Sequence, residues 1–171
     1  MLAGWGHGLA RKVRAVGGAV VRLRPRRSRC LGCGTTHILL PVGLLVRRAD
    51  TAAVVGGALS DRARGLGYRR IAAGNGRPPE TVRGWLRRFA GRLEAVRAVF
   101  TRLVRAVSVD PVVPGPASGP WADALVVIMA AFRGAQDRFG VFTVRVWDWV
   151  TAVSSGQLLA PGWPAGVINT S

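Results

Sequence analysis

The sequence predicts a mainly α-helical fold with a short β-hairpin at its N-terminus. Three observations predict it. First, residues 68–88 carry small, glycine and apolar residues at the spacing of two helices joined by a tight turn. Second, apolar residues recur every three or four positions from Leu86 to Val107. Third, residues 121–153 repeat that period after a Pro/Gly-rich stretch. We therefore expect a tri-helical helix-turn-helix unit followed by a C-terminal helical bundle.

Residues 1–45 form the expected β segment. Lys12 to Val16 and Ala19 to Arg24 alternate apolar and basic residues around Gly17-Gly18, a pair typical of a hairpin turn. Two strands alone are only marginally stable, so this hairpin needs support from the rest of the chain.

Residues 46–108 form the expected helix-turn-helix domain. Asp50 is predicted as the N-cap of a first helix that continues to Arg64, with Gly65 ending it. The next two helices lie on either side of Gly76, and Pro79 suits the opening of the third because its missing N–H costs nothing there. The residues expected to form the core of the motif are Ile71, Ala72, Gly76, Val82 and Trp85.

The apolar seam that follows the motif predicts a long extension of the third helix. Its members fall at heptad spacing: Leu86, Phe89, Leu93, Val96, Phe100, Leu103 and Val107. A seam of this length needs a partner, either the helical hairpin expected at residues 121–159 or a second copy of the chain. The bulky Phe89 and Phe100 favour packing within one chain over a two-stranded coiled coil. Residues 109–120 are predicted as a Pro/Gly linker, and residues 160–171 as a disordered tail.

Positive charge is concentrated in the first two thirds of the chain. The formal charge is +17, and residues 1–105 carry 22 of the 25 Lys and Arg residues against four acids. Such a charge suits a polyphosphate partner better than a small substrate. Arginine supplies 24 of the 25 cations, which fits bidentate contacts to phosphate and guanine, although a GC-rich genome also raises the arginine content.

The apolar segments and the cysteines bound the location of the protein. The longest apolar run, Ala124 to Phe132, is about half of the ~20 residues that a membrane-spanning helix needs, so no membrane partner is expected. Two cysteines three positions apart fit a reducing compartment better than a disulfide framework. We expect a cytoplasmic, nucleoid-associated protein.

Cys30 and Cys33 are the candidate metal ligands. Their CxxC spacing, followed by Gly34, is the pattern of one zinc knuckle, whereas a closed zinc site needs four ligands. His7 and His37 are the other candidates, and neither has a standard spacing. Bound zinc, an inert remnant and a redox-active pair are three open interpretations of this pair, and no other cofactor is expected.

The acids indicate no catalytic site, so we expect no enzymatic activity. The eight Asp and Glu residues are scattered along the chain. Asp123, Asp137 and Asp148 could converge on Mg²⁺ for nucleotidyl transfer, but the residues around them are typical of ordinary helix surface.

Four segments together resemble a bacterial helix-turn-helix family of unknown function, transposase-like, whose members carry an N-terminal zinc ribbon. The segments are residues 29–41, 47–50, 67–72 and 76–89, and the resemblance extends over most of residues 11–107. It implies DNA binding of the kind found in transposases of mobile elements, without the nuclease core. Similar proteins carry an earlier CxxC pair and this chain begins after that point, so we expect a truncated ribbon. Gly74-Asn75 replaces a helix former and a leucine, which predicts fraying at the end of the motif's first helix.

The expected function is sequence-reading binding to double-stranded DNA, of the transposase-associated or transcription-regulator kind. There are two alternatives. The first is a non-catalytic interaction module or decayed mobile-element remnant that assembles as a homodimer through the Leu86 to Val107 seam. The second is a nucleic-acid-processing enzyme. The residues predicted to read bases are Glu80, Thr81, Arg83, Gly84 and Arg87. The residues predicted to approach phosphates are Arg69, Arg70, Arg77 and Arg88.

Overall fold

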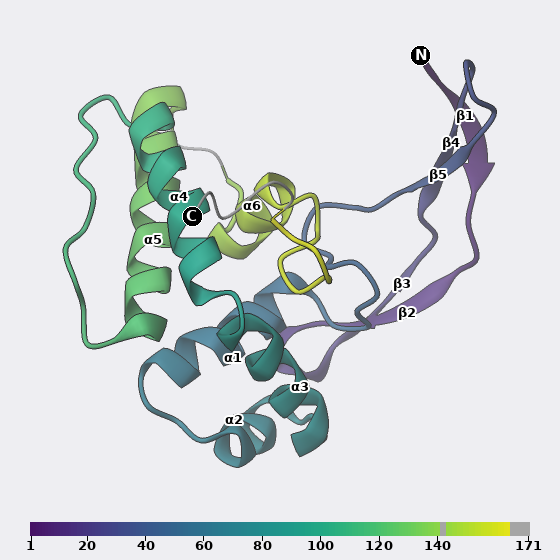
Figure 1. Cartoon of the computed structure of the whole chain (residues 1–171). Helices are drawn as coiled ribbons and strands as arrows, with labels where there is room; N and C mark the ends of the chain where they lie inside the picture. Colours follow the sequence, from purple (N-terminus) through teal and green to yellow (C-terminus); the bar gives the residue numbers. More distant parts are fainter. Residues whose placement is uncertain (141–142, 165–171) are drawn as a thin grey trace.

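The computed structural model describes residues 1–140 and 143–164. These residues form six α-helices, which make up the body of the molecule, and two small antiparallel sheets (Figure 1). The mainly α-helical class expected from the sequence is correct. The strands are β1 (Leu2–His7), β2 (Arg11–Arg14), β3 (Val20–Leu23), β4 (Arg26–Cys30) and β5 (Thr36–Leu39). The helices are α1 (Ala52–Ala63), α2 (Tyr68–Asn75), α3 (Pro79–Ala90), α4 (Leu93–Val107), α5 (Pro120–Phe139) and α6 (Val146–Val153).

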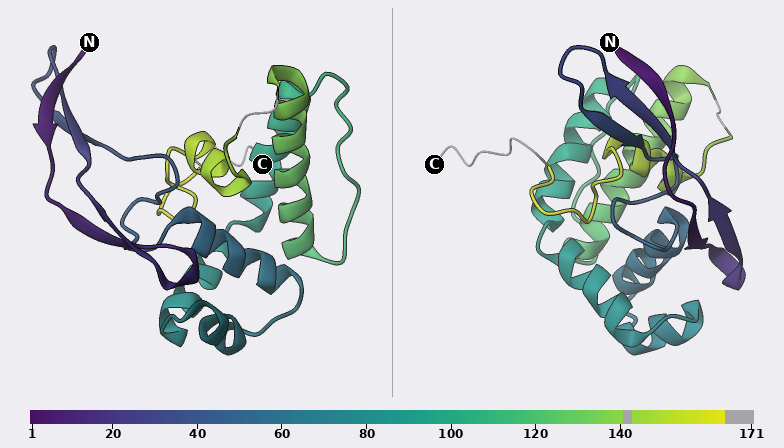
Figure 2. Two further views of the ribbon diagram at one scale, coloured as in Figure 1. Left: turned by 180° about the vertical axis from the view of Figure 1, so that it is seen from behind. Right: turned by 90° about the vertical axis from the view of Figure 1, so that its right-hand side faces the viewer.

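The strands make two sheets where the sequence predicted one hairpin. β2 and β3 form that hairpin, with Arg11 opposite Leu23 and with Gly17 in the left-handed region at φ +70°. β1, β4 and β5 form a further three-stranded sheet in the order β1-β4-β5, which the sequence did not predict. This sheet projects away from the helices, as Figure 1 and the left view of Figure 2 show. A strand packed on a hydrophobic core alternates buried and exposed residues. β1 lacks this alternation, because all of its residues except Ala3 are exposed.

The hairpin docks on the helical body. Val13 is buried, the Arg14 amide donates to the Ala49 carbonyl at 2.8 Å, and the Thr51 amide donates to the Arg14 carbonyl at 2.9 Å. These contacts supply the support that two isolated strands lack.

A left-handed glycine joins α2 and α3. Gly76 lies at φ +60° and ψ +41°, a conformation that costs glycine little and other residues about 1–2 kcal/mol. Pro79 occupies the first turn of α3, where its missing N–H leaves no bond unmade. The expected fraying at Gly74-Asn75 is not observed: α2 is helical to Asn75, and Gly76 ends it.

The prediction of one continuous third helix is wrong. α3 ends at Ala90, and the Arg92 amide donates to the Phe89 carbonyl, three residues back, which tightens the last turn. The backbone of Arg92 then leaves the helical region, at φ −137°. Heptad spacing continues through this turn, so the pattern could not reveal the change of direction that brings α4 against α5.

α5 and α6 cover the apolar seam of α4 within the same chain. Val96, Phe100 and Val104 are at most 1% exposed. The Trp149 ring of α6 lies with its centroid 6.0 Å from that of Phe100 and 5.6 Å from that of Phe132 on α5. One hydrophobic cluster extends from Leu45 to Leu159 and includes residues from all six helices. The segments predicted as separate domains, 46–108 and 121–159, therefore share a core.

Two close helix contacts depend on small residues. A Cβ at Gly56 of α1 would collide with the Trp147 indole of α6, and a Cβ at Gly134 of α5 would collide with the Ser108 side chain after α4. These helices approach closely because both positions lack a side chain.

The predicted disordered tail begins too early. Leu158 and Leu159 are 1% exposed, and Trp163 packs against the hydrophobic cluster. Within the expected tail, Trp163 therefore packs on the core, and residues 165–171 lie outside the described residues.

Candidate nucleic-acid interface

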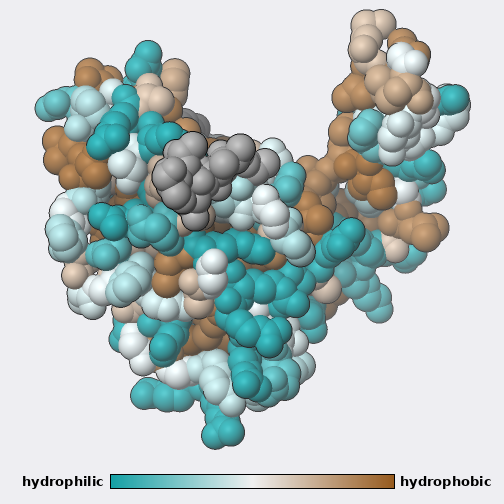
Figure 3. All heavy atoms as spheres, viewed as in Figure 1, coloured by the Kyte–Doolittle hydropathy of each residue, from teal (hydrophilic) through white to brown (hydrophobic). Residues whose placement is uncertain are grey.

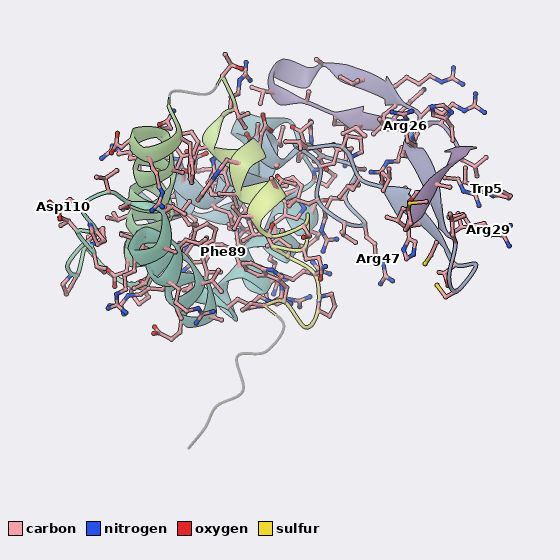
Figure 4. The ribbon with its side chains drawn as sticks, turned by 90° about the horizontal axis from the view of Figure 1, so that it is seen from above. Trp5, Arg26, Arg29, Arg47, Phe89 and Asp110 are labelled. Atoms are coloured by element: carbon pink, nitrogen blue, oxygen red, sulfur yellow. The ribbon has the colours of Figure 1, made fainter. Side chains whose placement is uncertain are left out.

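The α2–α3 pair is fixed by four buried side chains. Ile71 and Ala72 of α2 are each 1% exposed, and Val82 and Trp85 of α3 are 0% and 2% exposed. With Phe89, which lies inside the helical body in Figure 4, they turn one face of α3 toward α1 and α2. The other face of α3 is left to solvent.

Arginines dominate the exposed face of α3. Arg83 and Arg87 lie one turn apart and are both exposed, and Thr81 and Gly84 are half-buried beside them. Arg83 Nη1 lies 3.4 Å from a carboxylate oxygen of Glu80, in a pair whose side chains are 62% and 74% exposed. An ion pair this exposed contributes at most about 1 kcal/mol, so Arg83 can exchange Glu80 for another acceptor at little cost.

Three predicted phosphate contacts are accessible. Arg69 and Arg70 are exposed in the first turn of α2, and the Arg69 guanidinium lies 5.6 Å from the centroid of the Tyr68 ring. Arg88 is exposed on α3 and donates from Nη1 to the Gly84 carbonyl at 2.9 Å. On the face seen in Figure 3, hydrophilic residues cover much of the lower body, where α2 and α3 lie.

Arg77 does not fit its predicted role as a phosphate contact. Its side chain is 5% exposed, and its Nε donates to Asp50 Oδ1 at 2.5 Å. Its Nη1 donates to the carbonyls of Asn75 and Gly76 at 3.1 and 3.2 Å, and its Nη2 donates to that of Ala15 at 3.4 Å. Because every guanidinium nitrogen has an internal acceptor, Arg77 holds the α2–α3 turn against the rest of the protein.

Asp50 is the centre of this network rather than a helix N-cap. Its side chain is 3% exposed and accepts from Arg14 at 2.8 Å as well as from Arg77. Thr51 precedes α1, and no side chain caps that helix terminus. This network was not predicted, although the sequence carries one signal of it: Asp50 is the first acid of the chain and follows ten Lys and Arg residues.

Positive charges also gather where α3 ends. Burial lowers the pKa of the Arg48 guanidinium, and the neighbouring charges of Arg88 and Arg92 lower it further. Burial and then Arg88 lower the pKa of Arg92 in the same way. These three guanidiniums are therefore close enough to repel one another. Local sequence patterns could not predict this grouping, because Arg48 is 40 residues from Arg88 along the chain.

The projecting sheet carries further exposed cations. Arg26 and Arg29 of β4 are exposed, and Figure 4 shows Arg29 beside Trp5 of β1 at the far side from the helices. The Arg29 guanidinium lies 4.8 Å from the centroid of the Trp5 ring. Hydrophobic residues are also exposed along this sheet in Figure 3.

Cys30 and Cys33 lie at the β4–β5 turn without a complete ligand set. Cys33 is exposed, and hydrogen bonds with the side chain and backbone of Thr35 lower the pKa of its thiol to about 7. Within residues 1–140 and 143–164, no three His, Cys, Asp or Glu side chains gather as a metal site, so His7 and His37 do not complete one. Zinc at the two cysteines stays a proposal that needs further ligands.

The three aspartates considered for Mg²⁺ do not gather in the part of the chain that the structure describes. Asp123 accepts the Ala117 amide at 2.5 Å and so fixes the entry to α5. Asp148 of α6 lies against the loop before α1, where a Cβ at Gly43 would approach its Oδ1 to 2.7 Å. Each of these two carboxylates has a local structural contact.

The comparisons add no relative. The chain matches no protein-family model and no curated protein, and its structure matches no solved structure. Among the described residues, no helix combines the length and the apolar character needed to cross a bilayer.

Proposed function

We propose that this protein binds double-stranded DNA through α2 and α3, which act as a helix-turn-helix with α3 in the major groove. The observation that carries the proposal is the two-sided character of α3. Val82, Trp85 and Phe89 are buried on one side, and Arg83 and Arg87 are exposed on the other. A helix held rigidly by its inner face can present a few side chains to base edges in the groove.

The predicted roles divide along this surface, with one change. Arg83 and Arg87 read guanine, assisted by Glu80 and by the part of α3 at Thr81 and Gly84. Arg69, Arg70 and Arg88 contact phosphates, which orients the protein without reading sequence. Arg77 has no direct role, because its guanidinium is bound internally.

The seam alternative has less support. Assembly through the Leu86 to Val107 seam needs that surface to be open, whereas Val96, Phe100 and Val104 are buried within this chain. We therefore propose a tri-helical helix-turn-helix braced by α4–α6, with a transposase-associated or regulatory role.

Selection of bound duplexes from a random DNA library tests the proposal. At about 0.15 M salt, attraction between distant charges is largely screened while close base contacts persist. Wild type is compared with R83A/R87A and with R102A/R105A, which removes two exposed arginines from α4 instead. The expected result is one enriched motif for wild type and R102A/R105A, lost in R83A/R87A. Each guanine contact should be worth about 1–3 kcal/mol of discrimination.

Two results would reject base reading by α3. One is no enrichment by wild type, together with weak, salt-sensitive binding in all three proteins. The other is the same enriched motif in wild type and R83A/R87A.

A further inference from the structure

The arginine cluster at the end of α3, formed by Arg48, Arg88 and Arg92, draws its members from three segments. Arg48 lies in the loop before α1, Arg88 in the last turn of α3, and Arg92 in the turn between α3 and α4. Burial lowers the pKa of Arg48 and of Arg92, and the neighbouring positive charges lower it further: Arg88 and Arg92 act on Arg48, and Arg88 acts on Arg92. Like charges held this close cost free energy unless an anion lies between them.

The cluster lacks acidic partners. In the described part of the chain, none of the three cluster arginines forms an ion pair with a carboxylate. The arginines that do so are Arg14, Arg64, Arg77, Arg83 and Arg97. Glu94, the nearest acid along the chain to Arg92, lies 3.7 Å from Arg97.

Two guanidinium nitrogens of the cluster are buried and unpartnered. Arg48 Nε and Arg92 Nη1 are out of contact with solvent and have no hydrogen-bond acceptor. A buried donor without an acceptor is costly, and most such groups in native proteins are paired or belong to a binding site. Both residues are only half-buried overall, so other parts of their guanidiniums reach the surface.

The loop that carries Arg48 is fixed. Leu44 and Leu45 are buried, and the Val46 amide donates to the Gly156 carbonyl at 2.8 Å. Arg47, which precedes Arg48, holds the left-handed conformation at φ +58° that residues other than glycine rarely adopt. The position of Arg48 beside α3 is therefore built into the fold.

We propose that Arg48, Arg88 and Arg92 bind one phosphate group, and that in the complex this is a phosphate of the DNA backbone next to the groove that α3 enters. Arginine suits this role because its planar fork of N–H donors matches phosphate oxygens. Arg88 lies one residue from Arg87, at the edge of the exposed face of α3, so a phosphate bound there would fix the depth and angle of the helix. This assignment of the backbone rests on the proposed DNA binding, whereas the phosphate chemistry does not.

Thermal unfolding of the full chain tests the phosphate site without DNA. Wild type, R48Q/R92Q and the control R102Q/R105Q are compared in sodium chloride and in inorganic phosphate at equal ionic strength. Phosphate should raise the Tm of wild type and of the control but not that of R48Q/R92Q. In chloride, R48Q/R92Q should melt no lower than the control, because the substitutions relieve repulsion. An equal rise in Tm with phosphate in all three proteins would overturn the site. A Tm of R48Q/R92Q in chloride well below that of the control would also overturn it, because the two arginines would then stabilise the fold.

The salt dependence of DNA binding identifies the source of the phosphate. R48Q/R92Q should weaken binding to all duplexes alike and lower the slope of log K against log salt by about 1, with base preference unchanged. A lost phosphate effect on Tm with an unchanged slope would overturn the backbone assignment and leave a site for free phosphate. If wild type selects no motif yet phosphate still protects it through these arginines, base reading fails and the phosphate site stands. If wild type selects a motif and R48Q/R92Q changes neither slope nor phosphate protection, the cluster proposal fails alone.

Discussion

Replacement of Arg77 by methionine separates a structural role from a DNA-binding role. The substitution keeps the length of the side chain but removes its bonds to Asp50 and to three carbonyls. Removing one partner of a buried ion pair typically costs about 3–5 kcal/mol. Asp50 would keep Arg14, whose side chain is 39% exposed, so we expect about 3 kcal/mol. For a chain of this size that loss corresponds to a fall in Tm of about 6–12 °C.

The assay is urea unfolding followed by circular dichroism, with R83M as the matched control. Arg83 is 62% exposed, so R83M should change the free energy of unfolding by no more than about 0.5 kcal/mol. In DNA-binding measurements below the melting range, R77M should keep the salt slope of wild type. A loss of under about 1 kcal/mol with R77M would refute the buried network. A reduced salt slope in a fully folded R77M protein would return Arg77 to the DNA surface.

The other predictions concern glycines and a thiol. G76A should lower the free energy of unfolding by about 1 kcal/mol, because Gly76 has a left-handed backbone conformation. G74A should raise the free energy of unfolding by about 0.5–1 kcal/mol, because Gly74 is exposed within α2 and alanine favours helix. Urea titrations that found the same sign for both variants would contradict this. G56A should cost about 1–3 kcal/mol through collision with the α6 indole, whereas G57A, which has open space, should not destabilise α1; equal Tm values would contradict the close contact. Because the thiolate is the reactive form, alkylation of Cys33 should rise with pH through a midpoint of about 7; a midpoint near the ordinary value of 9 would mean that the Thr35 hydrogen bonds are absent in solution.

Local patterns predicted the helices and the inner face of the α2–α3 pair. Apolar periodicity placed Val82 and Trp85 inward, and glycine at position 76 marked the turn, because the hydropathy of a side chain and the backbone freedom of glycine are properties of single residues. The same patterns could not show that α3 stops at Ala90, since the heptad spacing passes through the turn unchanged.

Contacts between distant residues lay beyond the sequence. Arg77 had the same local signature as Arg83, an arginine beside the expected reading helix, yet one is buried against Asp50 and the other is exposed. The three-stranded sheet was missed for a similar reason: β1 pairs with β4 across a long separation, and its glycine-rich strand carries no alternation. Arg48 joined Arg88 and Arg92 only through folding.

The sequence by itself determined the helical class, the basic character of residues 1–105 and the inward and outward faces of α3, because these follow from periodicity and charge along the chain. The tertiary structure alone decided which arginines are available to a partner. Charge is written in the sequence, but burial and ion pairing depend on which acids and carbonyls folding brings near. A single carboxylate, Asp50, binds Arg77 inside the protein. Among the described residues no carboxylate pairs with Arg48 or Arg92, and we propose that a phosphate takes that place.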